Sequence, residues 1–171
     1  MARLANKVTV VVGAGQTPGS TIGNSRATAI RFAEEGASVL LVDRNGDSAA
    51  ETLTMVQERG GNGSCFVADV TDEAQCLAIT ATCIERYGRI DVLHNNVGIA
   101  AHDSGPTSIT EAVWDQIFDV NLKAIMFVCK HALPVMRQQK GGSIINISSI
   151  AAVCEMGLVS YKASKAGMNA Y

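Results

Sequence analysis

The strongest constraint on the fold is a series of short apolar runs that are rich in β-branched residues. Each run is continuous rather than alternating, which is typical of strands covered on both faces, as in parallel sheets. The segments between the runs are long enough for crossover helices. We therefore predict an α/β fold in which a parallel sheet lies between two helical layers. The predicted strands are residues 8–12, 38–42, 64–68, 90–93 and 143–147.

Helical spacing and stop signals divide the segments between these strands. The glycines at 36, 60 and 88 follow three of the predicted helices and favour their termination. Pro134 lies inside the fourth, so we expect a kink or break near Leu133. A last helix begins at Ser160 and stops at Tyr171 with no glycine or proline to terminate it. The predicted helices are residues 22–33, 47–59, 72–87, about 110–139 and 160–171.

Composition excludes several classes of protein. The chain is 171 residues long, 47% hydrophobic and carries a net charge of −2, which fits a globular domain and not a nucleic-acid binder. No apolar run approaches the roughly 18 residues of a membrane span. The five cysteines form no CxxC pair, and the three histidines have no ligand-spaced partner, so we expect no disulfide framework and no metal. A reducing compartment, the cytoplasm, fits this cysteine usage.

A glycine-rich turn follows the first predicted strand and leads into the first helix. Gly13, Gly15, Gly19 and Gly23 would let backbone N–H groups approach a pyrophosphate at the helix N-terminus. Asp43 ends the second strand 20 residues after Gly23, which is the spacing of an acid that binds the adenosine ribose. These features predict a doubly wound, Rossmann-like dinucleotide fold. The carboxylate favours NAD over NADP, although the adjacent Arg44 could soften that preference.

Later motifs resemble the short-chain dehydrogenase/reductase family in their order along the chain. LHNNVG resembles the family's NNAG motif, VNLKA contains its helix-kinking asparagine, INISSIA its serine segment, and YKASK matches YxxxK. The glycine turn departs from the family pattern, because it is four residues longer and has Val12 in place of a threonine. The resemblance covers the chain from about Lys7 to its end. It implies a single dinucleotide-binding and catalytic domain, residues 1–171, that lacks the last strands of the family fold.

Tyr161 and Lys165 are four residues apart, so a helix would place both side chains on one face. An ammonium beside a phenol favours the phenolate, which suits a general acid/base near neutral pH. The implied reaction is reversible hydride transfer between NAD and a secondary alcohol or ketone, in which Tyr161 exchanges the hydroxyl proton.

The resemblance also implies roles for the remaining site residues. Asn121 would help to hold a water on the proton path from Lys165, and a serine hydroxyl would hold the substrate oxygen. The family motif selects Ser149 for this serine, whereas the distance to Tyr161 selects Ser148, so both stay open and Ser149 is preferred. The cofactor-binding set is Gly13, Gly15, Gly19, Ile22, Gly23, Asp43, Asp69, Val70, Asn95, Gly98, Tyr161 and Lys165.

Two other functions compete with an oxidoreductase. A nucleotide-binding module without catalysis is the main alternative, because the chain stops inside the helix that bears Tyr161. A hydrolase is disfavoured, because the sequence has no GxSxG elbow. By resemblance we also expect a homo-oligomer, a dimer or tetramer, that acts on a small molecule and binds neither nucleic acid nor membrane.

Overall fold

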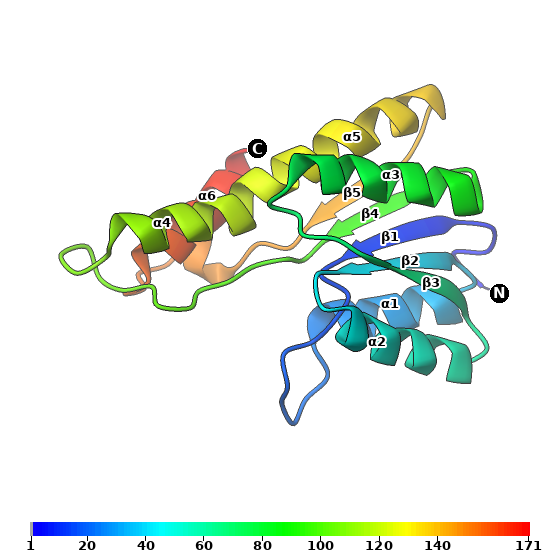
Figure 1. The fold of residues 1–171 in the computed structure, drawn as a ribbon, viewed down its shortest axis with the longest axis horizontal. Helices are drawn as coiled ribbons and strands as arrows, with labels where there is room; N and C mark the ends of the chain where they lie inside the picture. The colour runs from blue at the N-terminus through cyan, green and yellow to red at the C-terminus, as the bar shows by residue number, and fades with distance from the viewer. Residues whose placement is uncertain (1) are drawn as a thin grey trace.

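Five parallel strands form one sheet in the order β3-β2-β1-β4-β5 (Figure 1). The chain builds outward from β1 to β3 and then crosses over to β4 and β5, so the direction of winding reverses between β1 and β4. This topology confirms the doubly wound parallel sheet. The computed structural model describes residues 2–171. The strands are β1 (Val8–Val12), β2 (Ser38–Asp43), β3 (Asn62–Val67), β4 (Val92–Asn95) and β5 (Ser143–Asn146).

Helices cover both faces of the sheet (Figure 1). Val11 of β1 packs into the core beneath α1 and α2, whereas Val10 and Val12 belong to the core on the side of α3 and α5. The alternation of side chains along β1 therefore serves two separate hydrophobic cores. No helix in residues 2–171 combines the length and the apolar character that a membrane crossing requires. The helices on the two faces are α1 (Asn24–Glu34) and α2 (Gly46–Glu58), then α3 (Glu73–Tyr87) and α5 (Ala124–Gln138).

The edge strands are less buried than the continuous apolar runs predict. All five residues of β1 are buried, but Val67 of β3 is 58% exposed and Ile145 of β5 is 38% exposed. The prediction of coverage on both faces is therefore correct for the central strands and wrong for β3 and β5. An edge strand has one neighbouring strand instead of two, so one side of it stays open to solvent.

The irregular point of the long helical segment is not at Pro134. The segment consists of α4 (Glu111–Phe118), a π-helix (Asp119–Lys123) and α5, and α5 continues through Pro134 to Gln138. The prediction of a break near Leu133 is therefore wrong. Ala132 and Met136 flank the proline and are buried in the core, and this packing holds the helix together across the missing N–H group.

The last helix, α6 (Val159–Ala170), contacts both α4 and the π-helix. It lies beyond the carboxyl end of the sheet in Figure 1, beside α4. A short 3₁₀-helix (Ile150–Ala152) lies in the segment that connects β5 to α6. The fold thus brings α6, the π-helix and the carboxyl ends of β4 and β5 to the same edge of the sheet.

Candidate active site

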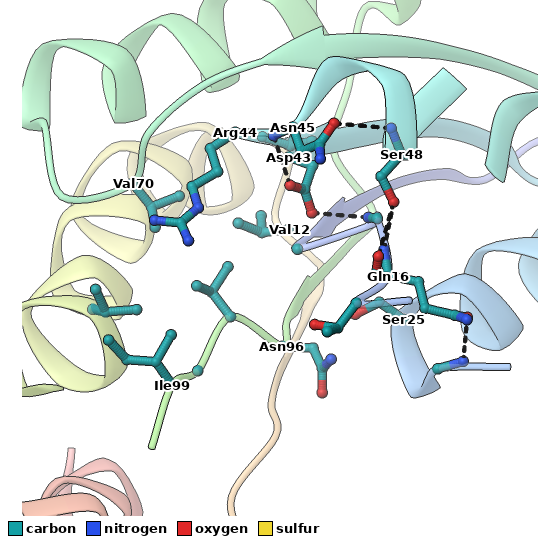
Figure 2. Close-up of a pocket in the computed structure, with 18 of the residues that line it drawn as sticks. Val12, Gln16, Ser25, Asp43, Arg44, Asn45, Ser48, Val70, Asn96 and Ile99 are labelled. Atoms are coloured by element: carbon teal, nitrogen blue, oxygen red, sulfur yellow. Dashed lines mark hydrogen bonds between the residues drawn. The ribbon is translucent and has the colours of Figure 1, made fainter. Parts of the chain in front are cut away.

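A cleft of about 660 Å³ opens at the carboxyl ends of β1 and β4, where the direction of winding reverses (Figure 2). This is the position where doubly wound sheets bind their ligands. Its walls come from the turn after β1, the ends of β2 and β3, the loop after β4 and Val120 of the π-helix. Eight residues of the predicted cofactor-binding set line it, namely Gly13, Gly15, Gly19, Gly23, Asp43, Asp69, Val70 and Gly98.

The carboxylate of Asp43 fixes the glycine turn. One of its oxygens accepts a hydrogen bond from the Gly15 N–H at 2.9 Å, and the other accepts one from the Asn45 N–H at 2.9 Å (Figure 2). A Cβ at Gly15 would lie 2.9 Å from Asp43 Oδ2 and 2.9 Å from Ser48 Oγ. The absence of a side chain at Gly15 is therefore what lets the turn approach the end of β2.

A second group of polar side chains, from the turn itself and from α1 and α2, stabilises the glycine turn by hydrogen bonds. The Ser48 hydroxyl accepts from the Gln16 N–H at 2.8 Å, and the Gln16 side chain accepts from the Gly23 N–H at 2.6 Å. Arg26, only 6% exposed, donates to Thr52 Oγ1 at 2.9 Å and to the Ser48 carbonyl at 3.1 Å. Our sequence interpretation missed these residues. The detectable signal was a pair of small polar residues, Ser48 and Thr52, one turn apart on the otherwise apolar face of a helix.

The acid after β3 is also held in place. Asp69 accepts hydrogen bonds from the Thr71 N–H at 2.9 Å and from the Thr71 hydroxyl at 2.7 Å. These two bonds, the backbone one first, lower the pKa of Asp69 below its usual value. Asp69 is therefore an anion at neutral pH, at the side of the cleft that is lined by Val70.

Four residues of the predicted set do not line the cleft, namely Ile22, Asn95, Tyr161 and Lys165, and the last two lie on α6. Ile22 precedes α1, which begins at Asn24, and its side chain is 53% exposed. Asn95 is 2% exposed and donates to Asn146 Oδ1 at 2.9 Å on the neighbouring strand. Because side chains alternate at the end of β4, Asn96 faces the cleft in its place.

Tyr161 and Lys165 lie together on α6, as their spacing predicts. The Lys165 ammonium is 5.8 Å from the centre of the Tyr161 ring and donates to the Ile147 carbonyl at 2.8 Å. Lys165 is only 3% exposed, and this burial lowers its pKa to about 8. The side chain therefore remains mostly charged at pH 7.

Gly98 connects the lysine to the cofactor cleft. It lines the cleft, and a Cβ at this position would lie 3.2 Å from Lys165 Nζ and 3.5 Å from Asn121 Oδ1. Gly98 therefore lies between the cleft and the Lys165 ammonium.

The Asn121 side chain is fully buried in the π-helix. Its oxygen accepts from the Ile99 N–H at 2.8 Å, and its amide nitrogen donates to the Ile99 carbonyl at 2.9 Å and to Ser164 Oγ at 3.1 Å. Both amide hydrogens are thus used by protein groups. Only the oxygen atoms of this residue, in the side chain or main chain, could still contact the predicted water.

The two candidate serines have different partners. The Ser148 hydroxyl donates to the Lys165 carbonyl at 3.3 Å, on the backbone of α6. The Ser149 hydroxyl accepts from the Ala151 N–H at 3.2 Å and caps the 3₁₀-helix. The hydroxyl hydrogen of Ser148 is therefore used in the bond to α6, whereas the hydroxyl hydrogen of Ser149 remains available to donate to another group.

Metal-ligating side chains do not gather anywhere in residues 2–171. The described part of the chain contains no group of three or more His, Cys, Asp or Glu side chains arranged to hold an ion.

Comparison with known proteins places this geometry in a family. The sequence model of the short chain dehydrogenases matches residues 7–171. A 3β-hydroxysteroid dehydrogenase of Mediterraneibacter gnavus is 36% identical over 151 residues, which are 88% of this chain and 52% of the relative. A 3-oxoacyl-(acyl-carrier-protein) reductase of Thermotoga maritima is 35% identical over 97% of this chain and 65% of the relative.

Solved structures show the same fold. A 7α-hydroxysteroid dehydrogenase in complex with NADH and a 7-oxo bile acid superposes with a TM-score of 0.87 at 30% identity, over 96% of this chain and 62% of that one. An NAD⁺-bound xylitol dehydrogenase superposes with a TM-score of 0.91 at 29% identity, over 98% and 63%. The chain thus spans between half and two thirds of the length of these curated relatives and structures. The resemblance carried by the sequence motifs is confirmed, and the chain belongs to the short-chain dehydrogenase family.

Proposed function

We propose that the protein transfers a hydride between NAD(H) and a secondary alcohol or ketone, with Tyr161 as the general acid/base. The observation that carries this proposal is the buried Lys165 ammonium, which lies beside the Tyr161 ring and against Gly98 at the wall of the cleft. The relatives in the family, named as dehydrogenases and reductases, support the reaction class. They make a binding module without catalysis the weaker alternative.

The cleft residues fit a nicotinamide dinucleotide. The close approach at Gly15 and the N-terminus of α1 after Gly23 suit a pyrophosphate, and the Asp43 carboxylate suits the hydroxyls of the adenosine ribose. Asp69 and Val70 would contact the adenine. The bound cofactor would supply the hydride acceptor or donor, while the chain supplies binding, orientation and the proton path.

NAD is preferred over NADP in this proposal because Asp43 would repel a 2′-phosphate. The carboxylate cannot easily turn away, since both of its oxygens accept backbone hydrogen bonds. Arg44 acts in the opposite direction, because its side chain extends across the mouth of the cleft toward Val70 (Figure 2). The NADH and NAD⁺ complexes of the solved relatives support the same choice of cofactor.

Proton transfer would proceed through Tyr161. In alcohol oxidation, the substrate hydroxyl gives its proton to Tyr161 Oη while the hydride leaves the same carbon, and in ketone reduction both transfers reverse. The Lys165 ammonium favours release of the phenol proton, and the Ser149 hydroxyl would donate a hydrogen bond to the substrate oxygen. Asn121 would act mainly by holding α6 in place through Ser164.

The family also suggests the kind of substrate and partner of this protein. We expect a small-molecule substrate and a second copy of the protein as partner, in line with the family. We also expect a reducing compartment, the cytoplasm, because the five cysteines are odd in number and form no CxxC pair.

The Tyr161→Phe variant tests the proposed acid/base. We expect turnover of a panel of secondary alcohols, followed as NADH formation by the full-length protein, to fall about 10²- to 10⁴-fold. Binding of NAD, measured by calorimetry, should remain unchanged. Tyr87→Phe is the matched control, because the Tyr87 hydroxyl bonds Ser64 on the edge strand, far along the sheet from α6. Undiminished turnover by Tyr161→Phe would show that another group carries the proton.

The Asp43→Asn variant tests the choice of cofactor. The wild-type protein should bind NAD at least about tenfold more tightly than NADP, which corresponds to about 1.4 kcal/mol. Asparagine keeps an acceptor for the Gly15 N–H but removes the charge, so the preference should shrink toward equal affinity. Asp47→Asn, an equal charge change in the exposed first turn of α2, should leave the preference intact. Tighter binding of NADP by the wild-type protein contradicts the role of Asp43.

The burial of Lys165 predicts a pH-dependent difference in stability between the wild-type protein and Lys165→Met. The pKa of about 8 in the folded protein lies below the ordinary lysine value of 10.5, because burial penalises the charged form at neutral pH. As the pH rises from about 8 toward 10.5, the folded wild type loses this proton before the unfolded chain does. The free energy of unfolding of the wild type should therefore rise relative to Lys165→Met, by on the order of 2 to 3 kcal/mol. Denaturant titrations between pH 7 and 10 measure this difference, and a constant gap would show that the ammonium is hydrated.

A further inference from the structure

The first turn of α6 carries Tyr161 but has no cap of its own. The first N–H groups of any helix lack partners within that helix. The residue at the N-cap position of α6 is Leu158, which makes no side-chain cap hydrogen bond. The first turn therefore depends on another part of the chain for its N–H partners.

Asp103, in the loop after β4, supplies them. Its carboxylate accepts from the Tyr161 N–H at 2.7 Å, from the Ser160 N–H at 3.2 Å and from the Ser104 N–H at 2.9 Å. The Ser104 carbonyl accepts from the Val159 N–H at 3.2 Å. Two adjacent loop residues thus satisfy three consecutive N–H groups at the start of α6, from 57 or 58 residues upstream in the case of Asp103.

The backbone conformation of the loop places the Asp103 carboxylate at the start of α6. His102, directly before Asp103, has a φ of 62°, in the left-handed region that few residues other than glycine adopt. The Asp103 N–H donates to the Ala100 carbonyl at 3.2 Å and closes a turn just before the acid. A negative charge at this point also interacts favourably with the positive end of the α6 dipole.

Other contacts fix α6 only beyond its first turn. Lys165 donates to the Ile147 carbonyl, Ser148 donates to the Lys165 carbonyl, and Asn121 donates to Ser164. Each of these bonds holds α6 at position 164 or 165, about one turn after Tyr161. Tyr161 itself lies in the turn that Asp103 and Ser104 hold.

We propose that Asp103 is a positioning residue for Tyr161, which sets the place of the phenol by capping the first turn of α6. This inference rests on the proposed function, because it assumes that the Tyr161 hydroxyl carries the proton. Asp103 does not line the cofactor cleft, so its removal should affect the chemical step and leave the binding of NAD unchanged. The loop that follows Gly98 at the cleft wall is thereby joined to the helix that carries the acid/base.

Asp103→Ala and Asp103→Asn test the proposal in the full-length protein. In Asp103→Ala, amide hydrogen exchange of residues 159–162 should accelerate about tenfold or more, and kcat for the best secondary alcohol should fall about 10- to 100-fold. The Kd for NAD should change less than twofold. Asparagine retains one acceptor oxygen, so Asp103→Asn should recover part of kcat and part of the protection.

Asp72→Ala is the matched control. Asp72 is the N-cap of α3 and accepts from the Ala74 and Gln75 N–H groups at 2.8 and 3.4 Å. α3 contacts the cleft at Asp69, whose N–H donates to Gln75, but it carries neither Tyr161 nor Lys165, so kcat is compared at saturating NAD. This variant should lower thermal stability while leaving kcat and the exchange of residues 159–162 at wild-type values.

The outcomes separate the inference from the proposed function. If kcat falls in Tyr161→Phe but both Asp103 variants keep wild-type kcat and wild-type exchange, the positioning role is overturned and the function stands. A fall in kcat for Asp103→Ala that is matched by an equal fall in Asp72→Ala shows general destabilisation and also overturns it. If Tyr161→Phe keeps full turnover, the proposed function and the positioning role fall together.

Discussion

The buried amide of Asn121 is the interaction on which the arrangement of the site depends. It joins three segments that are distant in the sequence, namely the loop after β4 through Ile99, the π-helix that bears it, and α6 through Ser164. Each of these bonds contributes on the order of 1 kcal/mol when made, but a buried partner left unsatisfied costs about 1–3 kcal/mol. The amide therefore acts less as a source of stability than as a restriction on which arrangement of the three segments is allowed.

The π-helix explains how the asparagine reaches that position. A π-helical turn inserts extra backbone into an otherwise α-helical segment and often occurs at functional sites. Here the turn lies between α4 and α5, and it places a polar side chain at a point where a regular helix packed on the core would carry an apolar one. The irregularity coincides with the tertiary contacts of Asn121 and not with Pro134, 13 residues later, where α5 continues without a break.

The two halves of the site are held by different kinds of contact. On the proposed cofactor side, hydrogen bonds join the turn after β1 to the end of β2 through Asp43 and to α2 through Ser48. The proposed catalytic side depends on α6, which also contacts α4 and the π-helix. One hydrogen bond joins α6 to the π-helix, two join it to the segment after β5, and three join it to the loop after β4. A substitution can therefore disturb the place of Tyr161 while the dinucleotide cleft remains intact.

The sequence predicted the sheet, its winding and most of the cleft, because those features depend on local patterns. The runs that became β1 and β2 are continuous and buried, and the spacing of Gly15 and Asp43 depends only on a strand, a turn and a helix. The exposure of Val67 and Ile145 was not predictable in the same way, because it depends on which strands lie at the edges. The placement of Asn96 instead of Asn95 in the cleft, and the contact from Asp103 to Tyr161, depend on where β4 ends and how the following loop folds back. Neither feature leaves a periodic signal in the chain.

We propose that Asn121 serves catalysis by holding α6 so that the Tyr161 hydroxyl meets the oxygen of the substrate. A double-mutant cycle on kcat, with Asn121→Ala, Tyr161→Phe and the combined variant in the full-length protein, tests this claim most directly. If the asparagine acts through the tyrosine, its replacement should slow the wild-type enzyme but should cost less than about twofold once the phenol hydroxyl is gone. Effects that multiply in the combined variant would contradict the account, because the two residues would then contribute to catalysis independently.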